Sequence, residues 1–319
     1  MDTTAITKDT QLCISLSGRP SNLGTRFHNH LYAELGLDYL YKAFTTRDLP
    51  AAVAGIRALG IRGCGVSMPF KEDVIALVDS MDASAMAINS VNTLVNTDGH
   101  LRAYNTDYVA VVSLLRDHGV DPGSTFAVLG SGGMARAVVA ALRDSGFAQG
   151  VVVARNEATG RPLAEEYGYR WQSEVGSARP RLVINATPIG MAGGPAAGEL
   201  PVEPVVVDAA ETVFEVVAVP IETPLVRRAR ANGARVITGA EVQALQATEQ
   251  FVLYTGIRPT DEQLAGAAEF SRAGEGLPLG EVPEEEHPTG GVDDPAEAAR
   301  AHVHRGEEYG STEGLGQRQ

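Results

Sequence analysis

Residues 125–144 read TFAVLGSGGMARAVVAALRD and contain the residue types that hold a phosphate-bearing nucleotide. Gly130 permits a tight turn, Gly132 lets the backbone approach a phosphate, and Ala135 lets the following helix pack closely on the preceding strand. Apolar residues on both sides of the turn predict a buried strand that runs into a helix, whose first N–H groups would face the anion. A strand-turn-helix with a purely structural role is the alternative. The dinucleotide-binding residues predicted here are Gly130, Ser131, Gly132, Gly133, Met134 and Ala135.

The residue that follows the next predicted strand, 151–154, indicates which dinucleotide binds. An NAD-binding protein would place a carboxylate there for the adenosine ribose, whereas this chain has Arg155. Because a guanidinium matches a 2′-phosphate in geometry and charge, Arg155 favours NADP as the cofactor. In the alternative interpretation, Glu157 holds an unphosphorylated ribose and Arg155 is a solvated surface charge.

Four polar residues in the first part of the chain have side chains suited to proton chemistry. They are Ser67 and Lys71 in VSMPFK, Asn92 in SVNTL and Asp107 in AYNTD. Loops at strand ends carry many functional sites, and a lysine beside a carboxylate can pass a proton to or from a hydroxyl group. Each residue also has a structural alternative. Lys71 would be a surface charge, Asn92 a turn residue, and Asp107 the N-cap of a helix that begins near Tyr108.

The elements that must position these residues alternate between strands and helices. In the first part, helical patterns at 27–35 and 49–59 separate strand patterns at 12–15, 39–44 and 63–68, and a hairpin is expected within 90–104. After the glycine-rich turn, strands are expected at 151–154, 182–185, 205–208 and 235–237. Helical spacing then continues over 240–254, where Gly256 is placed to end the helix.

This order predicts an α/β protein with two lobes, an amino-terminal α/β substrate domain and a doubly wound Rossmann domain that binds NADP. A length of 319 residues with 44% hydrophobic content is enough for two such cores. We expect the substrate domain to span 1–107 and to be completed by a helical segment at 240–272. The Rossmann domain then spans 108–239, and the two lobes enclose a cleft between cofactor and substrate.

The charge of the chain is concentrated in its last part. Residues 275–319 carry 11 acidic and three basic residues, which accounts for more than half of the net charge of −14. With four prolines and few large apolar residues, 273–319 is predicted to be an acidic disordered tail. The acidic balance argues against nucleic acid or an anionic membrane as a partner, and leaves a small-molecule substrate. Monomer and homodimer both remain open.

Segments that direct a protein to a membrane or out of the cell are not recognisable in the sequence. No apolar run approaches the roughly 20 residues that cross a bilayer, and the first ten residues lack the pattern of a signal peptide. The expected location is therefore the cytoplasm. Cys13 and Cys64 lie in apolar segments without metal spacing, which indicates buried thiols. His28 and His30, two residues apart, would point to different faces of a helix, so no metal site is expected.

Six motifs resemble, as a set, those of the shikimate dehydrogenases, and especially their divergent shikimate dehydrogenase-like branch. They occur in the family's order and approximate spacing from about residue 11 to residue 270, and they are VSMPFK, SVNTL, AYNTD, GSGGMA, NATPIGM and QATEQF. The resemblance implies reversible, NADP-linked reduction of 3-dehydroshikimate to shikimate. It also implies that Lys71 and Asp107 form the catalytic pair, in which the ammonium protonates the developing alkoxide and Asp107 orients it. Which of the two carries the proton stays open.

The resemblance also assigns binding residues. Asn92 and Gln246 match positions that bind the ring hydroxyls of the substrate, and Ser67 matches a threonine with a similar binding role. Gln246 has the alternative of being only an amphipathic-helix residue. On the cofactor side, the matching residues lie beneath the nicotinamide or contact its amide, and they are Asn185, Ala186, Thr187 and Gly239.

The chain departs from the family pattern where the substrate carboxylate binds. Aligned on His28, the family's serine-x-serine pair becomes Asn22 and Gly24, and the loop before them is shorter. Among the neighbouring residues, Arg26 could bind a carboxylate through two hydrogen bonds. Ser21 and Thr25 are further candidates.

A second departure is Ala218, which stands where a tyrosine usually contacts the substrate. Both departures lie on the substrate side, so the reaction type is defined better than the substrate. One alternative is therefore a dehydrogenase of a related cyclic hydroxy acid, of quinate or aminoshikimate type. The other is a non-catalytic nucleotide-binding regulator.

Overall fold

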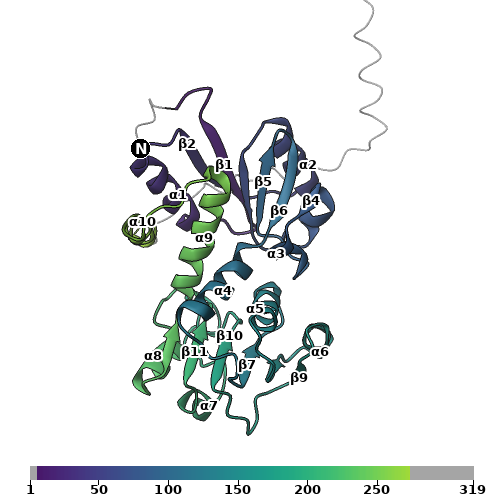
Figure 1. The fold of residues 1–319 in the computed structure, drawn as a ribbon, viewed down its shortest axis with the longest axis vertical. Helices are drawn as coiled ribbons and strands as arrows, with labels where there is room; N and C mark the ends of the chain where they lie inside the picture. Colours follow the sequence, from purple (N-terminus) through teal and green to yellow (C-terminus); the bar gives the residue numbers. More distant parts are fainter. Residues whose placement is uncertain (1–5, 274–319) are drawn as a thin grey trace, which may run out of the picture. The chain divides into compact units, whose positions relative to one another are not determined.

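The structure, a computed structural model, describes residues 6–273, which form two six-stranded sheets with helices around them (Figure 1). The predicted α/β class with two lobes is confirmed. Except for its first residue, the tail predicted at 273–319 lies outside the described residues. Within residues 6–273, no helix is both long enough and apolar enough to cross a membrane.

The first sheet is mixed, with parallel strands on one side and an antiparallel hairpin on the other. In spatial order its strands are β2 (Tyr39–Phe44), β1 (Gln11–Leu16), β3 (Gly63–Val66), β5 (Thr93–Thr97), β6 (His100–Tyr104) and β4 (Ser80–Met81). β1 runs parallel to both β2 and β3, whereas β5 runs antiparallel to both β3 and β6. Asp98 and Gly99 turn the hairpin with positive φ angles of 52° and 87°, as a tight two-residue turn requires. The predicted parallel unit and hairpin are confirmed.

Helices cover both faces of this sheet. On one face, α2 (Leu49–Ala58) packs Val53 and Ile56 against apolar side chains of β1 and β3. On the other face lies α1 (Leu23–Glu34), with the two last helices of the described chain. Shorter helical segments are the 3-10 helix at Asp73–Leu77 and α3 (Ala83–Met86). Cys13 and Cys64 are completely buried, as predicted, and burial raises the pKa of the Cys13 thiol to about 12.

The second sheet is entirely parallel and doubly wound. In spatial order its strands are β12 (Arg235–Ile237), β11 (Thr212–Glu215), β10 (Leu182–Asn185), β7 (Phe126–Leu129), β8 (Gly150–Val153) and β9 (Arg170–Gln172). Its helices are α4 (Thr106–Asp117), α5 (Gly133–Asp144), α6 (Glu157–Glu166), α7 (Pro204–Asp208) and α8 (Pro224–Ala231). The chain starts at β7 and moves outward first in one direction and then in the other. The switch point between β7 and β10 is where such folds bind nucleotides.

One predicted strand of this sheet is wrong. Residues 204–208 form the helix α7, and the strand is β11 a few residues later. Three consecutive valines fit a strand by composition, but Pro204 occupies the first turn of the helix, where a proline is well tolerated. Val206 and Val207 are buried against the sheet, so a short buried helix satisfies the same apolar pattern.

The last two described helices, α9 (Gly239–Thr255) and α10 (Asp261–Ala273), pack back on the first sheet's helices. α9 begins with a capping box between Thr238 and Glu241 and ends at Gly256, whose φ of 75° is left-handed, as predicted. It contacts α4 and α1, and α10 contacts α1 (Figure 1). Phe251 of α9 shares an apolar core with Leu31 of α1.

Candidate functional site

A pocket of about 230 Å³ opens at the carboxyl ends of β1 and β3. Its lining comes from the loops after these strands, from the first turn of α4 and from α9 and α10. Six residues predicted from the sequence line it together, and they are Ser21, Ser67, Lys71, Asn92, Asp107 and Gln246. Residues far apart in sequence therefore meet in one cavity.

Lys71 and Asp107 form an ion pair in this pocket, between the ammonium Nζ and the carboxylate Oδ2. Their side chains are 22% and 11% exposed, so the pair is largely shielded from water. The helix cap is Asn105, whose side chain accepts a hydrogen bond from the Tyr108 N–H, and Asp107 lies in the first helical turn. Lys71 is thus not an isolated surface charge and Asp107 is not the N-cap. The positive end of α4 also favours a carboxylate at this position.

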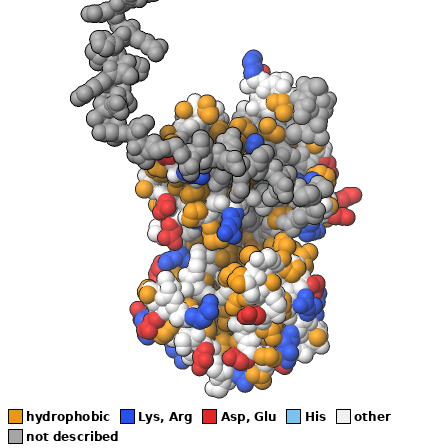
Figure 2. Space-filling model, turned by 180° about the vertical axis from the view of Figure 1, so that it is seen from behind, with side chains coloured by type: hydrophobic (Ala, Val, Ile, Leu, Met, Phe, Trp, Pro, Cys, Tyr) orange, Lys and Arg blue, Asp and Glu red, His pale blue; other side chains and the backbone are white. Residues whose placement is uncertain are grey.

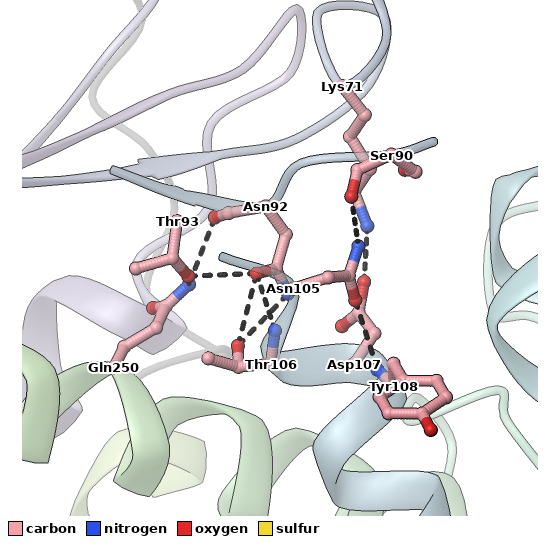
Figure 3. A network of polar contacts seen from close by, with 9 residues as sticks. All are labelled: Lys71, Ser90, Asn92, Thr93, Asn105, Thr106, Asp107, Tyr108 and Gln250. Carbon is pink, nitrogen blue, oxygen red and sulfur yellow. Dashed lines mark hydrogen bonds and ion pairs between the residues drawn. The ribbon is translucent and has the colours of Figure 1, made fainter. Parts of the chain in front are cut away.

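Asn92 is held by the start of α4 (Figure 3). Its Oδ1 accepts hydrogen bonds from the Thr106 N–H and the Thr93 hydroxyl, both at 2.8 Å, and its Nδ2 donates to the Thr106 hydroxyl at 3.0 Å. The side chain is buried, directly before β5, which excludes its interpretation as a turn residue. Because Thr106 precedes Asp107, the amide and the ion pair share one rigid frame.

Gln250 of α9 completes this network and was not predicted. Its Nε2 donates to the Thr93 hydroxyl at 3.0 Å and to the Asn92 carbonyl at 3.2 Å (Figure 3). It lines the pocket with Gln243 and Gln246, so α9 presents three amides on one side. Glutamines spaced by three and four residues are the sequence signal of such a polar helix face. Gln246 is therefore more than a solvated residue of an amphipathic helix.

The rim of the pocket differs from the prediction. Arg26 is not among the lining residues, because its guanidinium donates to the Phe270 carbonyl at 2.8 and 3.0 Å and stacks on the Phe270 ring. Arg26 thus ties α1 to α10. Asn22 is exposed and also stands outside the lining. The predicted candidate Ser21 does line the rim. With it are residues that were not predicted, Ser15, Ser17, Arg19 and Arg272.

The glycine-rich turn has the geometry of a phosphate site. Gly130 has a φ of 115°, and a Cβ there would lie 3.0 Å from the Ala186 carbonyl, so only glycine fits. Side chains added at Gly132 or Gly133 would meet open space, which leaves room for a ligand above the start of α5. Ala135 is completely buried against the strands, as its predicted packing role requires. The backbone N–H groups that begin α5 thus suit a pyrophosphate, and the residues present fit a dinucleotide.

The residues beside this turn bear on the choice of dinucleotide. Arg155 is exposed directly after β8 and forms no ion pair with any residue of 6–273. Glu157, the alternative ribose partner, forms an ion pair with Arg161, in which Oε1 of Glu157 lies 2.6 Å from Nη2 of Arg161. Ser131 of the turn lies 2.7 Å from the Thr159 hydroxyl of α6. This arrangement presents a guanidinium rather than a carboxylate beside the turn.

The remaining cofactor candidates lie at the switch point or at the start of α9. Asn185 ends β10 beside Gly130, and its Oδ1 accepts hydrogen bonds from the backbone N–H and hydroxyl of Thr187. Gly239 begins α9, where a Cβ would lie 2.2 Å from the Val217 carbonyl. The cofactor candidates stand outside the lining of the substrate pocket, so the shared cleft remains a prediction.

His28 and His30 both lie on α1, and their rings stack on different aromatic side chains, Tyr41 and Phe270. His28 is fully buried and its ring stacks on Tyr41 at 4.4 Å. Burial lowers its pKa to about 3, so the ring is neutral. In the described part of the chain, no three histidine, cysteine or acidic side chains gather to hold a metal ion.

On the surface shown in Figure 2, basic and acidic side chains of the described residues are interspersed. Among the described residues, several basic and acidic side chains pair across neighbouring elements, as Arg181 does with Glu211 and Arg228 with Asp208. Such pairs neutralise the surface locally, and each contributes little to stability.

A parallel, doubly wound domain with a glycine-rich turn, joined to a pocket with a lysine–aspartate pair, defines the class of two-domain nucleotide-dependent oxidoreductases. Residues 21–94 match the family described as "Shikimate dehydrogenase substrate binding domain". The "Shikimate dehydrogenase-like protein" of Haemophilus influenzae is 53% identical over 267 residues, which cover 84% of this chain and 98% of the relative. The chain therefore belongs to the shikimate dehydrogenase family.

Further relatives agree with this assignment. The "Shikimate dehydrogenase (NADP(+))" of Moorella thermoacetica is 36% identical over 262 residues, 76% of this chain and 88% of the relative. The solved structure of a shikimate 5-dehydrogenase-like protein superimposes with a TM-score of 0.82 and 53% identity, over 84% of this chain and 99% of that one. The enzyme of Thermus thermophilus, solved with NADP(H) and shikimate, gives a TM-score of 0.74 at 29% identity, over 82% and 99%.

Proposed function

We propose that the protein is an NADP-dependent oxidoreductase of shikimate dehydrogenase type, which reversibly reduces 3-dehydroshikimate to shikimate. The observation that carries this proposal is the Lys71–Asp107 ion pair inside the pocket that Asn92 and Gln246 also line. The named activity of the relatives and the bound NADP(H) and shikimate of the Thermus structure support it.

NADPH, when bound at the glycine-rich turn, supplies a hydride to the carbonyl carbon of the substrate. The carbonyl oxygen then needs one proton, and the Lys71 ammonium can donate it. Asp107 holds that ammonium in place through the ion pair. In the reverse direction the lysine accepts the proton of the hydroxyl. Asn92, fixed by Thr106, offers its amide to a neighbouring ring hydroxyl.

The rim of the pocket supplies the charge for an acidic substrate. Arg19 and Arg272 line it together with Lys71, whereas Asp107 is the acidic lining residue, so cations outnumber carboxylates. An excess of positive charge favours an anion, and Arg19 can bind a carboxylate through two hydrogen bonds. We assign the carboxylate to Arg19 and the neighbouring serines Ser17 and Ser21, in place of the predicted Arg26 and Asn22.

The proposed domain boundaries follow from the same pocket. Because α9 and α10 line it, we assign 240–272 to the substrate domain together with 1–107. Residues 108–239 then form the NADP-binding domain, which contains the second sheet.

Replacement of Lys71 tests the catalytic role directly. Lys71→Ala should lower kcat by at least about 100-fold, since proton transfer by a positioned group contributes about 10²–10⁴. The dissociation constant for NADPH should stay within about twofold, because the lysine lies outside the glycine-rich turn. Steady-state rates and NADPH fluorescence titration measure the two quantities. Unchanged turnover in Lys71→Ala would remove the lysine from the mechanism.

The substrate is tested on the unaltered protein. Turnover of shikimate and quinate, each with NADP and with NAD, should be highest for shikimate with NADP. Faster turnover of quinate would favour the related hydroxy acid dehydrogenase. NADPH binding without turnover of either acid would favour a regulator.

A further inference from the structure

Glu215 is a buried carboxyl group for which the proposed reaction has no direct use. It ends β11, and its side chain is completely inaccessible to solvent. In the parallel register of β10 and β11 it lies opposite Asn185, at the carboxyl edge of the second sheet. Within residues 6–273 its carboxyl contacts are neutral donors, without a lysine or arginine among them. A buried carboxyl group without a cation is costly unless its position serves a purpose.

The two oxygens of Glu215 connect three segments. Oε1 accepts hydrogen bonds from the Asn185 side-chain amide at 2.9 Å and from the Val217 N–H at 3.0 Å. Oε2 accepts a hydrogen bond from the Thr223 hydroxyl at 2.8 Å. These donors belong to the end of β10, the chain after β11 and the start of α8. One side chain thus fixes the spacing of three loops.

Each of these loops touches a cofactor candidate or its support. Asn185 also folds the following turn, in which Ala186 lies against Gly130. The Val217 carbonyl lies against Gly239, so closely that no Cβ would fit. Thr223 caps α8 through the Val226 N–H and stands next to Gly190 of the NATPIGM segment. A displacement of the Glu215 side chain would therefore move the loops that are proposed to lie beneath the nicotinamide.

We propose that Glu215 is a positioning residue for the cofactor, which sets the relative height of the 185–191 and 216–223 loops beneath the nicotinamide. The inference deepens the proposed function and rests on it. The length of the side chain matters more than its charge. Oε1 accepts hydrogen bonds from two N–H groups, which can only donate, so position 215 must keep an acceptor oxygen there. A glutamine keeps that oxygen, and the Thr223 hydroxyl can turn to accept from its amide nitrogen.

Two substitutions at position 215 separate these contributions. Glu215→Ala removes the acceptor of all three hydrogen bonds and should raise the dissociation constant for NADPH about tenfold, as a loss of about 1.4 kcal/mol of binding would. Glu215→Gln should restore NADPH binding to within about threefold of the unaltered protein. The KM for shikimate should stay within about twofold in both variants, because its pocket lies outside these loops.

Further variants keep the test informative if Glu215→Ala does not fold. Thr223→Val keeps the shape of the side chain and removes its hydrogen bond to Glu215 together with its cap on α8, and should weaken NADPH binding about threefold. The matched control is Tyr169→Phe, which removes the buried hydrogen bond to the Phe147 carbonyl at the opposite edge of the same sheet. It should lower the melting temperature without a change in NADPH binding.

Equal NADPH binding in the unaltered protein and in folded Glu215→Ala would overturn the inference. Where that variant is unfolded, unchanged binding in Thr223→Val would do so. A parallel rise of the NADPH and shikimate constants in proportion to lost stability would also overturn it, because this is the signature of a structural role. NADPH titration needs no turnover. Failure of the proposed reaction in the unaltered protein is therefore a separate result.

Discussion

Arg155 is the residue predicted to decide between NADP and NAD. Its guanidinium is exposed after β8, and Glu157, the possible ribose partner, is engaged by Arg161. A 2′-phosphate would therefore meet an available cation beside the glycine-rich turn, whereas an unphosphorylated ribose would meet no available carboxylate from Glu157.

Removal of this guanidinium should weaken NADP binding selectively. In Arg155→Ser, kcat/KM for NADP should fall about 10-fold or more, which corresponds to one lost charge-assisted hydrogen bond of about 1.5–3 kcal/mol. The value for NAD should change less than about twofold, because NAD lacks the phosphate. Glu157→Gln is the control and should change neither value. A loss of NAD turnover in Glu157→Gln, with Arg155→Ser unaffected, would instead support the ribose interpretation.

At the residue scale, motif positions could be predicted better than side-chain directions. Lys71 follows β3, Asn92 precedes the antiparallel β5 and Asp107 follows β6, and these three strand ends meet at one edge of the sheet. The direction of Arg26 depends instead on α10, more than 200 residues later in the chain. Local sequence carries no signal for such a contact. Arg19 could not be predicted for a similar reason. The pocket that it lines is formed in part by α9 and α10, which lie more than 200 residues later in the chain.

At the element scale, the starting point of α9 is constrained by close packing. Gly239 is its first residue, and the Val217 carbonyl leaves no space for a side chain. This carbonyl belongs to the backbone directly after β11, so it cannot move away as a flexible side chain would. The capping box of Thr238 and Glu241 fixes the same turn from the other side.

Gly239→Ala should therefore lower the free energy of unfolding by about 1–3 kcal/mol, the usual cost of overpacking. Urea denaturation measures the change. The matched control is Gly266→Ala in α10, where the added Cβ would lie 3.7 Å from His30, an ordinary contact. Because alanine favours a helix over glycine by about 1 kcal/mol, this control should be neutral or stabilising. Equal effects of the two substitutions would contradict the packing argument.

The one mistaken strand shows where periodicity fails at this scale. The run PVVVD contains the residues of a buried strand, yet it forms α7, and TVFE pairs with β10 instead. Short apolar runs fit a buried helical turn as well as a strand, since both hide every side chain. The patterns at 39–44, 182–185 and 235–237 agree with the observed strands β2, β10 and β12, each of which pairs in parallel with a neighbouring strand.

At the scale of the whole molecule, each of the two cores contains a buried ionisable side chain whose neutral form is favoured by burial. His28 belongs to the first, where burial lowers its pKa from 6.5 to about 3. Glu215 belongs to the second, where burial raises its pKa from 4.5 to about 7 although hydrogen bonds to the carboxyl group lower it. The two groups make stability depend on pH in opposite senses.

The signs follow from which state binds more protons. Between pH 6.5 and 3, the unfolded chain protonates His28 and the folded chain does not, so this group's contribution to stability is lost on acidification. Between pH 4.5 and 7, the folded chain protonates Glu215 more than the unfolded chain, so its contribution is lost as the pH rises. The two contributions oppose each other between pH 4.5 and 6.5.

Substitution of one group should therefore leave the pH dependence of the free energy of unfolding that is due to the other group. In His28→Phe, which keeps a ring to stack on Tyr41, the free energy of unfolding should rise on acidification from pH 7 to 4.5 relative to the unaltered protein. In Glu215→Gln it should fall over the same interval. At about 1.4 kcal/mol per pKa unit, each difference amounts to about 2–3 kcal/mol. Urea denaturation at several pH values measures both slopes, and all other ionisable groups form a common background. Parallel curves for the two variants would mean that these groups do not titrate as their burial requires.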